Sequence, residues 1–406
     1  MNHSAASLRP GGHDRRHGQL ACAMAAGLLP LLAAAATARA EIQTLYRGAA
    51  YTEAEGAARL DASAAQFTTR DQGLAHAAKI RQGILRGARL EKLPAPCPLA
   101  TIRHSLRKRD GYTVENVAFE SLPGFWVTGN LYLPLDGSGP LPGILCPHGH
   151  GADPRMNADT QARAAALARM GAAAFAYDMV GVGESTQVPH KHSETLRLQL
   201  YNSLRAVDFL LSLGMVDDGR LAATGESGGA TQTFLLAAVD PRIDVSAPVV
   251  QVSAHFYGGC VCESGLPIHK SAEHETNNVE IAASFAPKPQ LIVSDGADWT
   301  RNVARVEFPY IRRIYELHGA AGNVENAHFA NEGHDYGPSK RAAAYRFMAR
   351  HLGLELAAIQ NAEGEIDEGF FEPLAREELC VFTPARPRPS NAIENADEVI
   401  LRLDGR

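Results

Sequence analysis

Residues 221–230 read LAATGESGGA, and this segment gives the strongest indication of the architecture in the whole sequence. A short apolar run at 221–224 precedes the motif Gly225-x-Ser227-x-Gly229, and a helical pattern follows at 229–238. A serine between two glycines, with a strand before it and a helix after it, is typical of the sharp turn that lifts a nucleophilic hydroxyl above a sheet edge. We therefore predict that Ser227 is a nucleophile and not part of a plain glycine-rich turn.

On both sides of this motif, short apolar runs alternate with helical patterns. Two alternating segments, 112–119 and 125–133, are separated by a Pro-Gly turn and predict an antiparallel hairpin. Further strands are expected at 143–146, 172–177, 221–224, 245–252, 291–294 and 324–328, with helices at 158–170, 193–213, 229–238, 303–317 and 339–352. This order predicts an α/β fold with a mostly parallel central sheet, an N-terminal antiparallel hairpin and helices on both faces.

The remaining segments flank this core. Residues 41–110 are polar and Ala-rich, which predicts an N-terminal helical segment packed on a main domain at 111–353. Residues 253–287 have no clear period and interrupt the alternation, so we expect a lid or rim there. Residues 354–406 are acidic and then Pro-rich, which favours a C-terminal tail packed along the domain.

The composition is that of an ordinary globular protein. The chain has 406 residues, of which 45% are hydrophobic and 21% charged, and its net charge is -6. These values exclude a disordered or coiled-coil protein. The negative charge argues against nucleic acid as a partner. The oligomeric state cannot be read from the sequence.

The N-terminus has the three parts of an export signal. Basic residues at 9, 15 and 16 precede an apolar run at 20–38, and Ala38-Arg39-Ala40 is a small-residue cleavage site. We expect cleavage after Ala40, because Pro30 interrupts a run that would otherwise resemble a membrane anchor. Arg15-Arg16 leaves twin-arginine export open. The expected location is periplasmic or extracellular, with no membrane association after cleavage.

A nucleophilic serine needs a base and an orienting acid, and in this architecture the chain order is serine, acid, histidine. The strand at 291–294 runs into Asp295-Gly296-Ala297-Asp298, where either carboxylate could serve. We prefer Asp298, which lies further into the loop, whereas Asp295 could stabilise the turn. The base should follow the last strand, and His334 lies in that loop.

The oxyanion of a tetrahedral intermediate needs N–H donors. One should be the N–H of Gly228, and the other should come from the loop His148-Gly149-His150-Gly151, with His150 preferred over Gly151. A metal site from His148 and His150 lacks a third ligand, and Cys260-Val261-Cys262 alone is too sparse for zinc. We therefore expect no metal and no cofactor.

The chain resembles the α/β-hydrolase superfamily, and more narrowly its secreted bacterial acetyl xylan esterase-like and dienelactone-hydrolase-like branch. The resemblance covers roughly residues 110–352. It rests on the motifs already quoted, on Glu332-Gly333-His334-Asp335-Tyr336-Gly337, and on Asp178-x-x-Gly181-x-Gly183-x-Ser185, whose glycines fit a tight loop better than a dinucleotide fingerprint. Ser227 stands where true dienelactone hydrolases have cysteine, and Glu226 where glucuronoyl esterases have arginine.

The resemblance implies a secreted serine carboxylic-ester hydrolase with the triad Ser227, His334 and Asp298. Its expected substrate is an acetylated plant polysaccharide or oligosaccharide, or another small ester. Substrate contacts are predicted at Glu226, Trp299 and Tyr257, with Phe256 and Trp126 as further stacking candidates. The alternatives are a serine peptidase of the prolyl-oligopeptidase type and a catalytically inactive scaffold used for binding.

Overall fold

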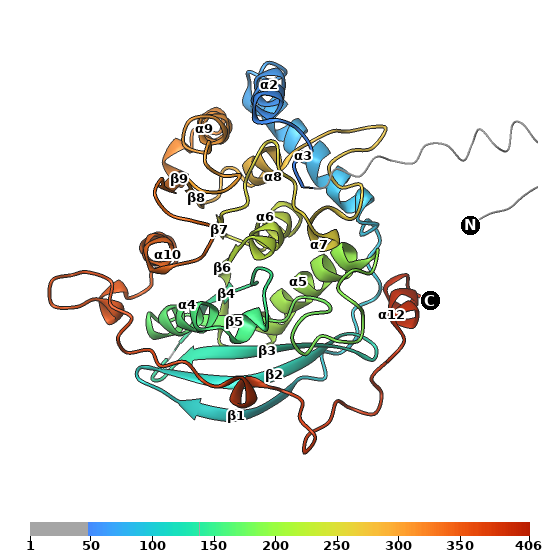
Figure 1. Ribbon diagram of the computed structural model, residues 1–406, viewed down its shortest axis with the longest axis vertical. Helices are drawn as coiled ribbons and strands as arrows, with labels where there is room; N and C mark the ends of the chain where they lie inside the picture. Colours follow the sequence, from blue (N-terminus) through green and yellow to red (C-terminus); the bar gives the residue numbers. More distant parts are fainter. Residues whose placement is uncertain (1–47, 138) are drawn as a thin grey trace, which may run out of the picture. The chain divides into compact units, whose positions relative to one another are not determined.

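The computed structural model describes residues 48–406 except residue 138, and these residues belong to one compact unit. Its centre is a nine-stranded sheet in the order β1-β2-β3-β5-β4-β6-β7-β8-β9 (Figure 1). The strands are β1 (Ile102–Lys108), β2 (Tyr112–Leu122), β3 (Phe125–Pro134), β4 (Leu141–Leu145), β5 (Ala173–Tyr177), β6 (Val216–Glu226), β7 (Val245–Val249), β8 (Gln290–Asp295) and β9 (Val324–Phe329).

The sheet changes from antiparallel to parallel at β5. Strands β1, β2 and β3 pair antiparallel, and so do β3 and β5. All pairs from β5 through β4 to β9 are parallel. The carboxyl ends of β4 to β9 therefore meet at one edge, where ligands bind in open α/β sheets. The predicted α/β-hydrolase fold class is confirmed.

Helices cover both faces of the sheet, as predicted. Alternate residues of β4 and β5 point to opposite faces: Leu145 and Phe175 belong to one apolar core, and Ile144 and Ala174 to the other. The first core is completed by α3 (Arg70–Gly87), α5 (Thr195–Ser212), α6 (Gly228–Val239), α8 (Asn278–Ala283) and α9 (Glu307–Leu317). The second is completed by α4 (Ala158–Arg169) and α10 (Pro338–Leu352). Figure 1 shows α4 and α10 on one side and α5 and α6 on the other.

The N-terminal prediction is partly wrong. Within the described part of this range, residues 48–110, there are two capped helices, α2 (Glu53–Ala64) and α3, but the helical region ends at Gly87 and Ile102–Lys108 is an edge strand. β1 is mostly exposed and charged, so its side chains gave no apolar alternation from which a strand could be predicted. The expected rim at 253–287 contains only two short helices, α7 (Val261–Ser264) and α8.

The C-terminal segment lies along the antiparallel strands. It contains α11 (Arg376–Leu379) and α12 (Ala396–Leu403), and Figure 1 shows it crossing β1, β2 and β3. Asn116 of β2, 1% exposed, donates from Nδ2 to the carbonyls of Glu378 and Cys380 at 2.9 and 2.8 Å. The side chains of Leu379 and Val381 are fully buried. These contacts make the segment an integral layer of the fold.

The predicted export signal and its cleavage site at Ala40 lie outside the described residues. Within residues 48–406, no helix combines the length and the apolar character that crossing a bilayer requires.

Candidate active site

Ser227 occupies the turn between β6 and α6. Its φ of 54° and ψ of -121° place it in a backbone region that residues with a side chain rarely adopt. The turn is held by hydrogen bonds from the Ser227 N–H to the Val249 carbonyl and from the Thr231 N–H to the Ser227 carbonyl, both 3.0 Å long. The strain at Ser227 is therefore built into the scaffold, as is common at functional residues.

The two flanking glycines are required by close packing. A Cβ on Gly225 would lie 2.3 Å from the carbonyl oxygen of Pro147, and one on Gly229 would lie 2.5 Å from the same atom. The turn thus packs directly against the loop that follows β4. That loop contains the second predicted oxyanion donor, so the glycines bring the two predicted donor segments together.

His334 and Asp298 are hydrogen bonded. His334 Nδ1 lies 2.6 Å from Asp298 Oδ2, and the Asp298 side chain is only 4% exposed. The other carboxylate oxygen, Oδ1, accepts from the N–H and the hydroxyl of Thr300, at 2.5 and 2.6 Å. With Nδ1 bound to a carboxylate, Nε2 of His334 is left to exchange a proton with a hydroxyl group.

Asp295 has different partners. Its Oδ1 accepts the N–H groups of Ala297 and Asp298 at 3.1 Å, and its Oδ2 lies 3.4 Å from Nζ of Lys340. Burial and the charge of Asp298 raise the pKa of Asp295. These contacts stabilise the turn that presents Asp298, which is the alternative role considered above for Asp295.

The loop carrying His334 reaches the strand of Ser227. The hydroxyls of Tyr336 and Thr224 are 2.6 Å apart, and these residues lie two and three positions from His334 and Ser227. Lys340 Nζ holds the same loop through the carbonyl of Gly333 and the carboxylate of Asp335. The loop is therefore held both by the strand that precedes Ser227 and by helix α10 (Pro338–Leu352).

The segment after β4 approaches the start of α6. Gly228 is the first residue of α6, so its N–H has no acceptor within the helix. A Cβ on Gly228 would lie 2.9 Å from Cε1 of His150, so the imidazole of His150 rests against this backbone. His148 is buried and accepts the Met179 N–H at Nε2, 3.1 Å away, and burial lowers its pKa. His148 thus supports the loop and does not face His150 as a second ligand.

Glu226, predicted to contact substrate, is held by protein groups. Its Oε1 accepts the N–H of Gly149 at 2.9 Å, and its Oε2 pairs with Arg163 at 2.8 Å. Burial alone would lower the pKa of Arg163, but the charge and hydrogen bond of Glu226 together with Cys146 and Tyr336 raise it. These contacts connect Glu226 to the loop after β4, and the substrate contact expected at Glu226 stays a prediction.

The predicted aromatic residues separate into two groups. Trp299 stacks on Phe256, with ring centroids 4.0 Å apart, and lies 4.5 Å from the ring of His334. Tyr257 is only 2% exposed and stacks on His269, and Trp126 is 4% exposed beside Val381 under the C-terminal segment. The structure therefore leaves Trp299 beside the histidine, with Phe256 stacked on it, and corrects the prediction for Tyr257 and Trp126, which are buried.

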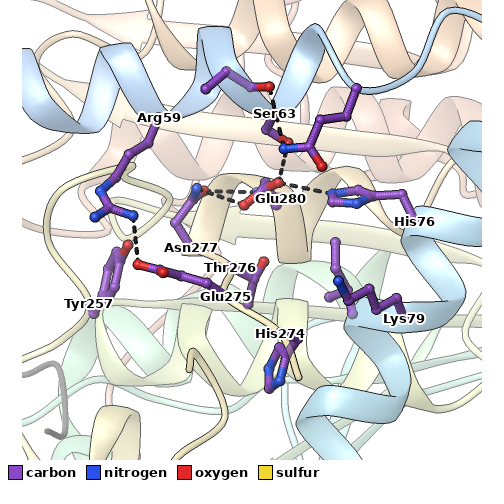
Figure 2. A pocket seen from close by; sticks show the side chains of 13 residues that line it. Arg59, Ser63, His76, Lys79, Tyr257, His274, Glu275, Thr276, Asn277 and Glu280 are labelled. Atoms are coloured by element: carbon purple, nitrogen blue, oxygen red, sulfur yellow. Dashed lines mark hydrogen bonds and ion pairs between the residues drawn. The ribbon is translucent and has the colours of Figure 1, made fainter. Parts of the chain in front are cut away.

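A separate cavity of about 220 Å³ lies among α2, α3 and residues 274–280 (Figure 2). Glu280 is hydrogen bonded there to His76 at 2.9 Å and to Asn277 at 2.9 Å, and also to Ser63. Tyr257 lines this cavity, but Ser227, Asp298 and His334 do not. The cavity belongs to the packing of the N-terminal helices.

Two groups among the described residues bring potential metal-ligating atoms within 4.8 Å of one another. One consists of Asp295, Asp298 and His334, whose polar atoms already bind one another, Thr300 and Lys340. The other consists of His150, His190, Cys260 and Cys262. The sequence analysis considered His150 and the two cysteines separately and did not consider His190. It also missed Arg163 and Lys340, because only the fold brings these distant positions together.

The chain is similar to several known hydrolases. Residues 124–313 match the family described as X-Pro dipeptidyl-peptidase (S15 family). No curated protein sequence matches the chain. Among solved structures, methylesterase BT1017 is 39% identical, with a TM-score of 0.81 over 88% of this chain and 79% of that one.

Two further structures show the fold alone. A putative acetyl xylan esterase from Bacteroides fragilis is 18% identical, with a TM-score of 0.51 over 66% of this chain and 78% of that one. A glucuronoyl esterase from Solibacter usitatus is 17% identical, with a TM-score of 0.51 over 67% of this chain and 92% of that one. Taken with the much closer similarity to methylesterase BT1017, the chain belongs to the α/β-hydrolase superfamily, in its esterase branch.

Proposed function

We propose that the chain is an exported serine esterase acting on carbohydrate esters, with Ser227 as nucleophile, His334 as base and Asp298 as orienting acid. The observation that carries the proposal is the 2.6 Å hydrogen bond from His334 Nδ1 to Asp298. The strained turn at Ser227 and the contact between Tyr336 and Thr224 support it, because they place a serine hydroxyl and the histidine loop at the same sheet edge.

The proposed reaction has two steps. Oγ of Ser227 attacks the ester carbonyl while Nε2 of His334 takes the hydroxyl proton, and the N–H groups of Gly228 and His150 bind the oxyanion. The C–O bond then breaks, and the imidazolium returns its proton to the leaving alcohol. Water attacks the acyl-enzyme with His334 again as base, which releases the acid and restores Ser227.

The ester chemistry has two candidates. The sequence resemblance favours an acetyl ester, in which the sugar hydroxyl is the leaving group. The 39% identical relative is a methylesterase, which favours a methyl ester of a carbohydrate acid, with methanol as the leaving group. Both reactions need the same triad. Release of acetate from acetylated carbohydrates or of methanol from methyl-esterified ones decides between them, and release of ferulate from feruloylated ones tests for a larger acyl group.

The nucleophile is tested by Ser227→Ala with a short-chain p-nitrophenyl ester. We expect kcat to fall by at least about 10³-fold, because removing a triad member leaves only binding and the oxyanion hole. Ser212→Ala is the control, since its hydroxyl bonds only to the Phe209 carbonyl at the end of α5. Retained turnover in a folded Ser227→Ala protein would refute the proposal.

A peptidase is the second candidate, because residues 124–313 match a family of X-Pro dipeptidyl-peptidases. An X-Pro p-nitroanilide assayed beside the esters distinguishes the two. If the amide is cleaved with a higher kcat/KM than every ester, the substrate class is wrong although the triad stands.

N-terminal sequencing of the exported protein tests cleavage after Ala40.

A further inference from the structure

Four sulfur and nitrogen side chains converge beside the proposed active site. His150 follows β4, His190 lies in the segment after β5, and Cys260 and Cys262 follow β7. Nε2 of His150 lies 3.2 Å from Sγ of Cys262 and 3.2 Å from Nε2 of His190, which lies 3.0 Å from Sγ of Cys260. One ligand atom of each residue thus lies within 4.8 Å of the other three.

Two thiolates and two imidazoles are a preferred ligand set for zinc. With zinc–nitrogen distances of about 2.0–2.1 Å and zinc–sulfur distances of about 2.3 Å, tetrahedral ligand atoms lie roughly 3.3–3.8 Å apart. The three separations in this cluster, 3.0–3.2 Å, are slightly shorter. Small outward side-chain rotations would therefore admit the ion without moving the backbone.

The surroundings of His190 and Cys260 orient their ligand atoms. Nδ1 of His190 lies 2.6 Å from the Val180 carbonyl, so Nδ1–H donates and the lone pair on Nε2 faces the cysteines. Such a backbone partner on the second ring nitrogen is characteristic of metal-binding histidines. On the opposite side, the N–H of Cys260 donates to Glu263 at 3.0 Å, which fixes the start of α7.

We propose that His150, His190, Cys260 and Cys262 bind one zinc ion in a closed structural site. Four protein ligands leave no position for a reactive water, so the ion stabilises the fold and does not hydrolyse substrate. The ligands come from loops after β4, β5 and β7, which lie in the sheet on either side of β6 and Ser227. The ion would therefore tie together three loops that surround the proposed nucleophile.

The site has a consequence for the oxyanion hole, and this part alone rests on the proposed function. The imidazole of His150 packs on Gly228. The backbone N–H of His150 is the second proposed oxyanion donor. A metal bond to the ring would restrict that backbone. Loss of zinc should therefore lower kcat more than it changes KM, because the donor acts mainly in the transition state.

The site is tested first by metal content. Reduced full-length protein is equilibrated with zinc sulfate, passed through gel filtration and analysed by mass spectrometry of the metal. We expect about one zinc per chain, and less than about a tenth of that in the double variant Cys260→Ser, Cys262→Ser. Cys97→Ser is the matched control, since Cys97 is a free cysteine that contacts the Glu120 carbonyl outside the cluster.

A second measurement does not depend on the folding of a variant. Cobalt(II) bound to the wild-type protein should show the intense visible bands of tetrahedral coordination and a thiolate charge-transfer band. A zinc content below about a tenth per chain in the wild type would overturn the proposal. So would an octahedral cobalt spectrum, undiminished zinc in a folded double variant, or a Cys260–Cys262 disulfide that persists under reducing conditions.

Discussion

The N–H of Gly149 donates to Oε1 of Glu226 at 2.9 Å. This hydrogen bond joins the residue before the proposed nucleophile to the residue before the proposed oxyanion donor His150. The second oxygen of Glu226 pairs with Arg163, which is almost completely buried. The carboxylate therefore connects the two parts of the site.

Glu226→Gln tests this positioning role. The amide oxygen can still accept from Gly149, but the ion pair with Arg163 is lost. We therefore expect a loss of about 1–3 kcal/mol in the free energy of unfolding. We also expect kcat to fall while KM stays nearly unchanged. Chemical denaturation and steady-state kinetics measure both. Glu325→Gln, which removes an exposed pair with Arg350, should cost less than about 1 kcal/mol. Equal losses in the two variants would contradict the role.

Asp298→Asn and Asp295→Asn should separate catalysis from stability. Asn at 298 keeps the size of the side chain but favours the wrong imidazole tautomer, so kcat should fall by about 10⁴-fold with little change in stability. Asn at 295 removes the buried carboxylate beside Lys340, whose ammonium then keeps only the more exposed Asp335 and Glu332, so stability should fall more than kcat. If kcat falls further for Asp295→Asn, the assignment of the acid is reversed.

Glu307 should make stability depend on pH. Burial raises the pKa of Glu307 to about 7 from its ordinary value of 4.5. Between these two pKa values the unfolded chain has released a proton that the folded chain retains. The free energy of unfolding therefore falls as pH rises through this window, by at most about 3 kcal/mol. Above pH 7 this loss of stability is complete. Below pH 4.5 both states are protonated and the penalty is absent.

Glu307→Gln removes this titration, so its stability relative to the wild type should improve steadily from pH 4.5 to pH 7. Thermal unfolding at several pH values measures the difference. Glu316→Gln, on the exposed face of the same helix, is the control and should follow the wild type. The assignment fails if the Glu307→Gln and wild-type curves stay parallel.

Ser227→Gly tests the backbone strain at the nucleophile. An ordinary Ala-to-Gly change lowers stability by about 0.5–1 kcal/mol, because glycine is freer in the unfolded chain. At a φ of 54°, glycine also relieves strain of about 1–3 kcal/mol. The Ser227→Gly protein should therefore be at least as stable as Ser227→Ala, although both are inactive. A Gly variant that unfolds more easily than the Ala variant would show that the turn is unstrained.

The sequence predicted the strands that are rich in apolar residues, because most of these strands are buried on both faces of the sheet. The hairpin β2–β3 and the parallel strands β4 to β9 are confirmed. They could be predicted because each contains a run of apolar residues that is visible in the local sequence. Strand β1 was missed because its residues are mostly charged or exposed and show no apolar alternation. Its extended conformation depends on pairing with β2.

The site was predictable only as far as chain order determines it. Ser227 follows β6, Asp298 follows β8 and His334 follows β9, and parallel strands bring their carboxyl ends to one edge. Arg163 lies on α4 and Lys340 on α10, and their contacts to Glu226 and Asp295 depend on helix packing that no local pattern encodes. The same holds for Tyr257 and Trp126, which have the residue types of a sugar platform but are enclosed by neighbouring segments.

The position of the C-terminal segment affects the order in which the parts of the fold can form during translation. Val381 covers Trp126, a residue that precedes it by 255 positions in the chain. During translation the β2–β3 hairpin therefore emerges from the ribosome long before its cover exists, and its apolar face stays open for that whole interval. Nascent chains halted just before residue 375 should consequently be bound by holdase chaperones, and release of the finished polypeptide should end that association.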